Sequence, residues 1–430
     1  MKMPSRLELL PGVFLTAVQT DQFKSSYWSL RLLRPLTEET AGENALLPRV
    51  LRRGTEACPD QERLAAALDE MYGGVVEPVV GKRGDVHCFG FVASFLDDAL
   101  VPDGTPLVER AASLLGDLLL HPAAQDGCLR EDYVAGEREN LLSEIRSQIN
   151  DKRSYALIRM TEEMCAGEPY RINRLGDPDR VAAIDAPALE GYYRGLLDSA
   201  RIELYYCGSA DPEQAAEAWR AALADLPRGQ AASLPETVQR PVDRVRRVSD
   251  RLEVTQGKLA MGFRTGIDLT SPDYPALVVA NAVFGGSSNS KLFLHVREQL
   301  SLCYYVSSAL DKYKGLMVVQ AGAEFDQLDR VESEVLAQLE RVRRGDFTEE
   351  ELQAAKKVLV RTYRSSLDVQ SQLEDFWLGQ NLAGLDFGPE GLAAQVEQVD
   401  AKQVVEAANR LRLDTVYRLL GPEGREEDIR

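Results

Sequence analysis

The chain has 430 residues and a formal net charge of −18, with 44% hydrophobic and 27% charged residues. This length exceeds one ordinary hydrophobic core and predicts several domains, while the composition is typical of a soluble globular protein. The excess of acidic residues argues against a nucleic-acid-binding protein, because phosphate binding requires a basic surface. It would suit a basic peptide or a basic partner, although a solvated acidic surface is the simpler explanation.

No segment has the unbroken apolar length needed to span a bilayer, and the first residues contain no signal-peptide core. We therefore expect a cytoplasmic protein with no membrane partner. The six cysteines are scattered without a C-x-x-C pair, which favours reduced thiols. His87 and Cys88 are adjacent, but neighbouring residues of a strand point to opposite faces. The pattern predicts no metal and no cofactor.

In the first half, a strand-like run at 27–33 leads to a short segment at 44–49 and a helical segment that starts at about Gln61. Residues 74–80 and 86–93 have the pattern of two strands and predict an antiparallel hairpin. Helices gathered on one face of such a sheet would make an α+β domain.

The second half repeats features of the first. In each half an aspartate suited to cap a helix, Asp185 or Asp400, precedes a helix that leads to a short buried strand ending at glycine. Earlier in each half, a longer helix carries Glu131 or Glu350 in its first turn, and Thr348 is placed to cap the second of these helices. A repeat of this length indicates duplicated domains rather than a solenoid.

A segment rich in Pro, Gly, Ser and Ala joins the two halves and predicts a linker. We expect an N-terminal domain at 1–225, a linker at 226–242 and a C-terminal domain at 243–430. The second domain repeats the hairpin pattern at 302–310 and 316–323. Each domain is therefore predicted to be α+β, with an antiparallel or mixed sheet and helices on one face.

Residues 44–49 read Asn-Ala-Leu-Leu-Pro-Arg and precede a Gly-Thr turn at Gly54. The segment resembles the zinc-binding helix of the insulinase-type (M16, inverzincin) peptidases, which reads His-x-x-Glu-His before a Gly-Thr turn. In that alignment the two histidine ligands fall on Ala45 and Arg49, and the catalytic glutamate falls on Pro48. Methyl, guanidinium and pyrrolidine groups cannot coordinate zinc or activate a water. The resemblance implies a degenerate motif and a chain that cannot hydrolyse a peptide by itself.

The family takes its third zinc ligand from a downstream helix that reads Glu-Arg-x-x-x-x-x-Glu. Here Glu144 matches that ligand and Glu137 matches its supporting acid. One carboxylate without its imidazole partners cannot bind zinc tightly at neutral pH. Taken by themselves, two acids about two turns apart on one helix are more often solvated or ion-paired.

In the second half, Gly285 and Gly286 lie in a loop where we expect positive φ, before a predicted helix at 291–300. The loop and the following Ser-Lys-Leu-Phe resemble the family's glycine-containing loop and its Ser-Arg-Leu-Phe stretch. Next, Arg297 and Tyr304 match the arginine and tyrosine of the family's Arg-Glu-x-x-Gly-Leu-Ala-Tyr-Ser-Val. Ser301 replaces the family's glycine.

In the family, the arginine and tyrosine lie opposite the zinc and hold the substrate backbone. The resemblance implies that Arg297, Tyr304, Gly285 and Gly286 bind substrate. A guanidinium and a phenol can both donate to a peptide carbonyl or a developing oxyanion. From the residues alone, Arg297 could also be a surface cation and Tyr304 a packed ring.

The resemblance implies a bacterial M16B-type subunit that is non-catalytic and forms half of a clamshell. In a heterodimer with a zinc-bearing paralogue it would bind peptides and help to process them. Two other classes remain open at this point. The chain could be a structural or scaffold protein, or a stand-alone peptide-binding module that closes as a homodimer.

Overall fold

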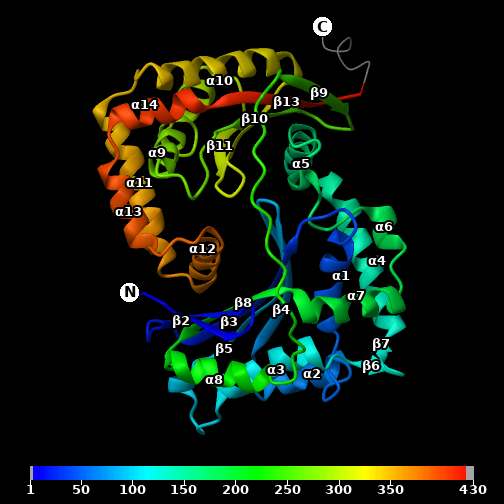
Figure 1. The fold of residues 1–430 in the computed structure, drawn as a ribbon. Helices are drawn as coiled ribbons and strands as arrows, with labels where there is room; N and C mark the ends of the chain where they lie inside the picture. The colour runs from blue at the N-terminus through cyan, green and yellow to red at the C-terminus, as the bar shows by residue number, and fades with distance from the viewer. Residues whose placement is uncertain (1–2, 423–430) are drawn as a thin grey trace. The chain divides into compact units, whose positions relative to one another are not determined.

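The strand β3 (Ser25–Pro35) shows how the sequence builds a two-faced sheet. Trp28, Leu30 and Leu32 are buried in the hydrophobic core, and Ser29 and Arg31 alternate onto the opposite face. The computed structural model describes residues 3–422 of the chain, whose helices and strands are arranged around two main sheets (Figure 1). Each sheet belongs to its own unit.

The two units do not follow the chain in strict order. The first contains Met1–Arg146, Ile172–Glu236 and Gln370–Leu378. The second contains the remainder, which is Ser147–Arg171, Thr237–Val369 and Gly379–Arg430. Each unit therefore includes one short segment from the other half of the sequence.

The first unit is built on a six-stranded sheet in the order β1-β2-β8-β3-β5-β4. The strands β2 and β8 pair in parallel, and the other neighbours are antiparallel. Besides β3, its strands are β1 (Ser5–Leu10), β2 (Val13–Gln19), β4 (Val75–Arg83), β5 (Val86–Leu96) and β8 (Arg201–Gly208), with a separate pair β6 (Ala124–Gln125) and β7 (Cys128–Leu129). Its helices are α1 (Ala41–Leu51), α2 (Gln61–Asp69), α3 (Leu107–Leu120), α4 (Glu131–Ser147), α6 (Pro178–Ala182), α7 (Ala186–Ser199) and α8 (Pro212–Ala222).

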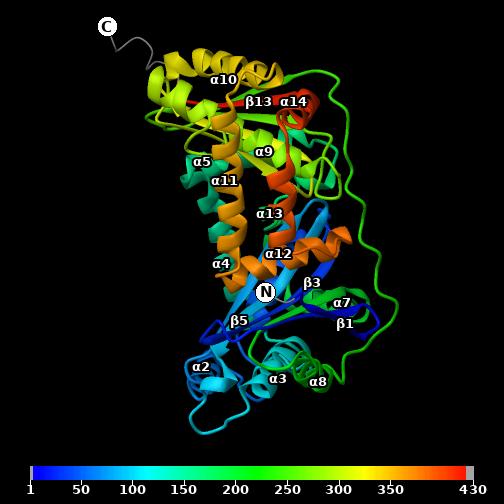
Figure 2. The ribbon, with the colours of Figure 1, turned by 90° about the vertical axis from the view of Figure 1, so that its left-hand side faces the viewer.

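The second unit is built on a five-stranded sheet in the order β11-β12-β10-β13-β9. Its strands are β9 (Arg246–Arg251), β10 (Gly257–Arg264), β11 (Tyr305–Asp311), β12 (Leu316–Ala323) and β13 (Arg412–Leu420). Its helices are α5 (Lys152–Met164), α9 (Tyr274–Phe284), the π-helix η4 (Leu292–Gln299), α10 (Leu328–Arg343), α11 (Glu349–Ser366), α13 (Pro389–Gln398) and α14 (Ala401–Arg410). Among these, α9, α11 and α13 pack against one another (Figure 2).

The two sheets have the same strand order. Counted from the hairpin edge, the first runs β4-β5-β3-β8-β2 and the second runs β11-β12-β10-β13-β9. In both, the last pair is parallel and the other neighbours are antiparallel. The first sheet has β1 as an additional edge strand. This agreement confirms the predicted α+β class and the duplication.

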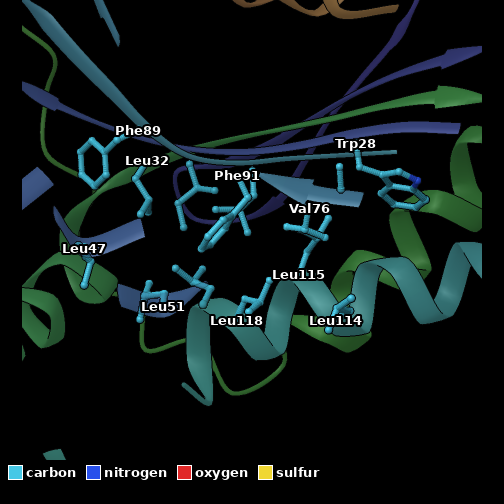
Figure 3. Packing of buried hydrophobic residues seen from close by; sticks show 14 of the residues in the cluster. Trp28, Leu32, Leu47, Leu51, Val76, Phe89, Phe91, Leu114, Leu115 and Leu118 are labelled. Atoms are coloured by element: carbon cyan, nitrogen blue, oxygen red, sulfur yellow. The ribbon is translucent and has the colours of Figure 1, made fainter. Parts of the chain in front are cut away.

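The main core of the first unit lies on one face of its sheet. Trp28 and Leu32 from β3, Phe91 from β5 and Leu118 from α3 belong to the same buried cluster. Figure 3 shows these side chains in the layer between the sheet and the helices. Since apolar surface removed from water contributes roughly 25 cal/mol per Å², this layer supplies much of the driving force for folding the unit.

Each sheet also carries one helical segment on its other face. In the first unit this is the beginning of α12 (Gln370–Ala383), whose Glu374 contacts Ser29 and Arg31. In the second unit it is α5, which packs on β10 and β13. The helices α5 and α12 follow the equivalent helices α4 and α11, so the two halves of the sequence exchange the same element.

The predicted helix starts are confirmed where a side chain caps the helix. The Asp185 carboxylate accepts from the Ala188 N–H at 2.8 Å, and Asp400 accepts from Gln403 N–H at the same distance. Thr348 caps α11 in a capping box. Within residues 3–422, every helix is too short or too polar to cross a lipid bilayer.

Candidate functional site

The helix α1 contains the three positions predicted to replace the zinc motif. Ala45 and Pro48 are buried, and Arg49 reaches out between α1 and α4. Pro48 lies inside the helix, where its ring removes the backbone N–H that would otherwise bond to the preceding turn. The helix nevertheless continues, with Arg52 N–H donating to the Pro48 carbonyl at 3.0 Å.

Two ion pairs join α1 and the turn that follows it to α4. Arg49 Nη2 lies 2.5 Å from Glu144 Oε2, and Arg53 Nη1 lies 3.2 Å from Glu137 Oε1. The earlier arginine pairs with the later glutamate and the later arginine with the earlier glutamate, so the two segments run antiparallel. The Arg49 and Glu144 side chains are 21% and 39% exposed. Solvent screening at that exposure limits such a pair to about 0.2–1 kcal/mol.

The donor set at this position does not fit zinc. Of the three predicted ligand positions, only Glu144 has a group that can bind a metal, and a guanidinium occupies the side chain facing it. Across residues 3–422, no cluster of three or more His, Cys, Asp or Glu side chains is arranged to hold a metal ion. Neither ion pair was predicted from the sequence. The available signal was the four-residue spacing of Arg49 and Arg53, which matches the four-residue separation of neighbours along a helix.

A buried polar network fixes α1 from the other side. Asn44 is fully buried, its Nδ2 donates to His87 Nδ1 at 3.1 Å, and the Tyr192 hydroxyl donates to its Oδ1. His87 Nε2 in turn donates to the Arg174 carbonyl at 3.0 Å. Burial lowers the pKa of His87 to about 3, so the imidazole stays neutral at physiological pH. His87 therefore positions the motif helix, a role that the sequence analysis missed.

In the second unit, Arg297 and Tyr304 have separate partners. The Arg297 guanidinium carbon lies 4.8 Å from the centroid of the Phe293 ring, and its Nε lies 3.6 Å from Glu298 Oε1. Tyr304 is exposed, and its hydroxyl donates to Glu324. This hydrogen bond raises the pKa of Tyr304, so the phenol remains a donor at neutral pH. Their role in binding substrate stays a prediction.

The expectation of positive φ at Gly285 and Gly286 is wrong. Gly285 has φ of −154°, and Gly286 is not among the residues with positive φ. Both glycines are needed for close packing instead. A Cβ on Gly285 would lie 2.6 Å from Leu292 Cδ1 and from Ser308 Oγ, and one on Gly286 would lie 2.5 Å from Asn281 Nδ2.

The residue that does adopt positive φ is Ser301, at 49°. It follows the π-helix η4, which ends with Leu300 N–H bonded to the His295 carbonyl at 3.0 Å. The predicted helix at 291–300 is therefore wound as a π-helix over most of its length. Ser301 occupies the position where the related motif has glycine, which explains why glycine is favoured there.

Comparisons with known proteins agree with this arrangement. The family profile described as "Peptidase M16 inactive domain" matches residues 183–359. The chain is 33% identical over 417 residues to "Probable inactive metalloprotease YmfF" of Bacillus subtilis, covering 96% of this chain and 97% of that protein. It is 24% identical over 341 residues to "Uncharacterized zinc protease YmxG" of the same organism, covering 77% and 76%. The crystal structure of a conserved protein from Enterococcus faecalis V583 is similar with a TM-score of 0.90 and 25% identity, covering 98% and 99% of the two chains. The chain belongs to the M16 peptidase family.

Proposed function

We propose that this chain is a non-catalytic M16 subunit that acts in the cytoplasm with a zinc-bearing paralogue, binding peptides and helping to process them. The observation that carries the proposal is the ion pair between Arg49 and Glu144. It places a permanent cation against the remaining carboxylate, at a position without imidazole ligands and without a general base. Peptide hydrolysis would then depend on a second chain.

The relatives support the pairing. One bacterium has two proteins similar to this chain, one named a probable inactive metalloprotease and the other a zinc protease. Both are matched over most of their length. In our proposal these two kinds of protein are the two parts of a divided peptidase.

Arg297 and Tyr304 supply the groups that such a subunit could contribute. The Tyr304 phenol is exposed and protonated. Its hydroxyl, which donates to Glu324 in the free chain, can donate to a peptide carbonyl instead when a peptide is bound. The Arg297 guanidinium is partly exposed and can hold the peptide backbone. In this proposal Tyr304 acts on the developing oxyanion and Arg297 acts mainly in binding.

The test is to purify the chain with a zinc-bearing paralogue from its own organism and to measure peptidase activity. With the pair assembled, Tyr304→Phe should lower turnover on the order of 10²-fold, as for a lost oxyanion donor. Arg297→Ala should raise KM more than it lowers kcat. Neither change should alter thermal unfolding, because both side chains are partly or fully exposed.

Matched controls separate these effects from the loss of any surface group. Tyr72→Phe also removes an exposed tyrosine hydroxyl that is bonded to an acid, and Arg364→Ala removes an exposed arginine paired with Glu397. Both controls should retain full activity. If the Tyr304 and Arg297 variants also retain it, the scaffold alternative is favoured. A chain that assembles only with itself and still binds peptide would favour the homodimeric module.

A further inference from the structure

On the α5 face of the second sheet, one glycine lets a tyrosine ring lie across the strands. Tyr305 pairs with Gly322, and Gly322 pairs with Lys258, so the three residues lie side by side on β11, β12 and β10. A Cβ on Gly322 would lie 2.4 Å from Tyr305 Cε1. The ring therefore covers the space that a side chain at this position would fill.

Two cations approach this ring. The Arg153 guanidinium carbon, from α5, lies 4.5 Å from the ring centroid, and Lys258 Nζ lies 5.8 Å from it. Both distances are within the range of cation–π attraction. The ring thus holds two positive charges near one another, although like charges repel.

Lys258 is only 9% exposed, and within residues 3–422 neither a hydrogen-bond acceptor nor an ion-pair partner contacts its ammonium group. The Lys258 side chain is covered along most of its length, but its ammonium nitrogen is not among the buried, partnerless polar atoms of the described residues, so it stays accessible to solvent. Burial of the side chain first, and the nearby Arg153 charge second, lower the pKa of Lys258. The side chain therefore presents an unpaired cation to solvent.

Two acids, Asp151 and Glu253, line the same cavity as Arg153 and Lys258. Asp151, whose charge also acts on Lys258, caps α5 with its carboxylate. That carboxylate accepts from the N–H groups of Arg153 and Ser154 at 3.0 and 3.2 Å, and from the Ser154 hydroxyl at 2.5 Å. Arg153 donates to uncharged acceptors, at 3.2 Å to Gln320 Oε1.

Arg153 and Lys258 line a cavity of about 540 Å³. This volume accommodates one or two amino-acid residues, since small-molecule sites typically measure about 300–1,000 Å³. Gln256 lines the same cavity, and its Oε1 is buried without a hydrogen-bond partner among the described residues. The cavity lining therefore includes cations, two acids and a glutamine whose Oε1 has no hydrogen-bond partner among the described residues.

We propose that this cavity binds the C-terminal residue of a peptide, with the terminal carboxylate between Lys258 and Arg153. Once the half-buried Gln256 side chain turns toward the cavity, its Oε1 accepts from the N–H of that residue. A C-terminal residue is the part of a peptide that offers a carboxylate and an N–H within one residue of each other. This inference rests on the proposed peptide-binding function and names the chemical group that is recognised.

The experiment uses the full chain and a fluorescently labelled tetra-alanine peptide in three forms. The forms are the free acid, the C-terminal amide, and an amide in which one internal alanine is replaced by glutamate. The free acid should bind at least about tenfold more tightly than the simple amide, as expected for hydrogen bonds to a charged group. Lys258→Met and Arg153→Gln should each weaken binding of the free acid by about tenfold to a hundredfold, and leave the amide unchanged.

A stability measurement gives a second readout. Lys258→Met should not lower the melting temperature, because within residues 3–422 the ammonium group has no hydrogen bond or ion pair to lose. The matched control is Lys402→Met, which removes the same charge from a side chain that is 82% exposed. The control should change neither the melting temperature nor the binding.

The outcomes distinguish this inference from the proposed function. Equal binding of the free acid and the amide would overturn the carboxylate site and leave peptide binding intact. Tight binding of the internal-glutamate amide would overturn the assignment to the C-terminus. If no peptide binds but acetate still stabilises the wild type and not Lys258→Met, the anion site is supported and the peptide-binding function fails.

Discussion

Removing Glu374 should separate a segment of the second half of the sequence from the first sheet. Glu374 accepts from Arg31 Nε at 2.9 Å, from Arg31 Nη2 at 3.1 Å and from Ser29 Oγ at 3.0 Å. The Arg31 and Glu374 side chains are 12% and 4% exposed. Breaking a buried pair by removing one partner typically costs about 3–5 kcal/mol, because the other charge is left uncompensated. Arg31 retains some contact with water, so we expect Glu374→Ala to cost about 3 kcal/mol, at the lower end of that range.

Urea unfolding followed by tryptophan fluorescence measures this cost, since Trp377 lies in the same segment and is buried. The matched control is the next residue, Asp375, whose side chain is 58% exposed although its partner Arg83 is only 11% exposed. Asp375→Ala should cost less than Glu374→Ala, because solvent screening weakens a pair whose carboxylate is exposed. The double variant Arg31→Met with Glu374→Met should cost clearly less than the sum of its single changes, because no buried charge remains.

Equal costs for Glu374→Ala and Asp375→Ala would refute the reasoning, because it predicts a larger loss of stability for the carboxylate that is shielded from solvent. Strict additivity in the double variant would lead to the same conclusion. Either result would mean that residues 370–378 do not pack on the first sheet.

Three other changes test separate parts of the structure. A variant that combines Ala45→His, Pro48→Glu and Arg49→His should bind about one zinc per chain, measured by elemental analysis, because two imidazoles and one carboxylate form the inverzincin ligand set. Adding Glu144→Ala should abolish that zinc binding. Ser301→Gly should raise the free energy of unfolding by about 0.5–1 kcal/mol. A left-handed backbone costs a non-glycine residue about 1–2 kcal/mol, and the greater conformational entropy of glycine in the unfolded chain offsets part of that gain. A lower free energy of unfolding would contradict this prediction. Burial alone would raise the pKa of Glu168, but hydrogen bonds from Arg264 and Lys314 outweigh it and hold that pKa below its ordinary value. The stability that Glu168 contributes should therefore be present at neutral pH and be lost as the pH falls through the folded-state pKa, and Glu168→Gln should flatten the acid limb of stability against pH.

Features set by local sequence were predicted well. The strand β12 begins and ends at the predicted residues, β8 ends at a glycine as predicted, and the caps at Asp185, Thr348 and Asp400 form as expected. The alternation of buried and exposed residues in a strand, and the hydrogen bond of a helix cap, both depend on residues that are close together in the sequence. They can therefore be recognised from the sequence directly. The repeated order of these elements was enough to infer two similar α+β units.

The packing of α5 and of residues 370–378 could not be predicted from local sequence. The apolar face of α5 shows that the helix must be buried, but its pattern does not say on which sheet it packs. The same holds for residues 370–378. Glycine is ambiguous for a related reason: Gly285 serves close packing and not an unusual dihedral, and both uses look the same in a sequence. Partners that are distant along the chain decide these cases.

Arg49 and Lys258 differ in whether another side chain balances their charge. Arg49 stands where the related peptidases have a zinc ligand, and it has a carboxylate partner in Glu144, so its charge is balanced within the fold and can be explained by structure alone. Lys258 is more deeply buried than Arg49 and has no such partner within the described chain. The Lys258 ammonium faces a cavity and has no ion pair that explains its position, so we propose a role in binding for it. The proposed function and the proposed cavity site therefore rest on different observations, the ion pair of Arg49 for the first and the unpaired Lys258 for the second.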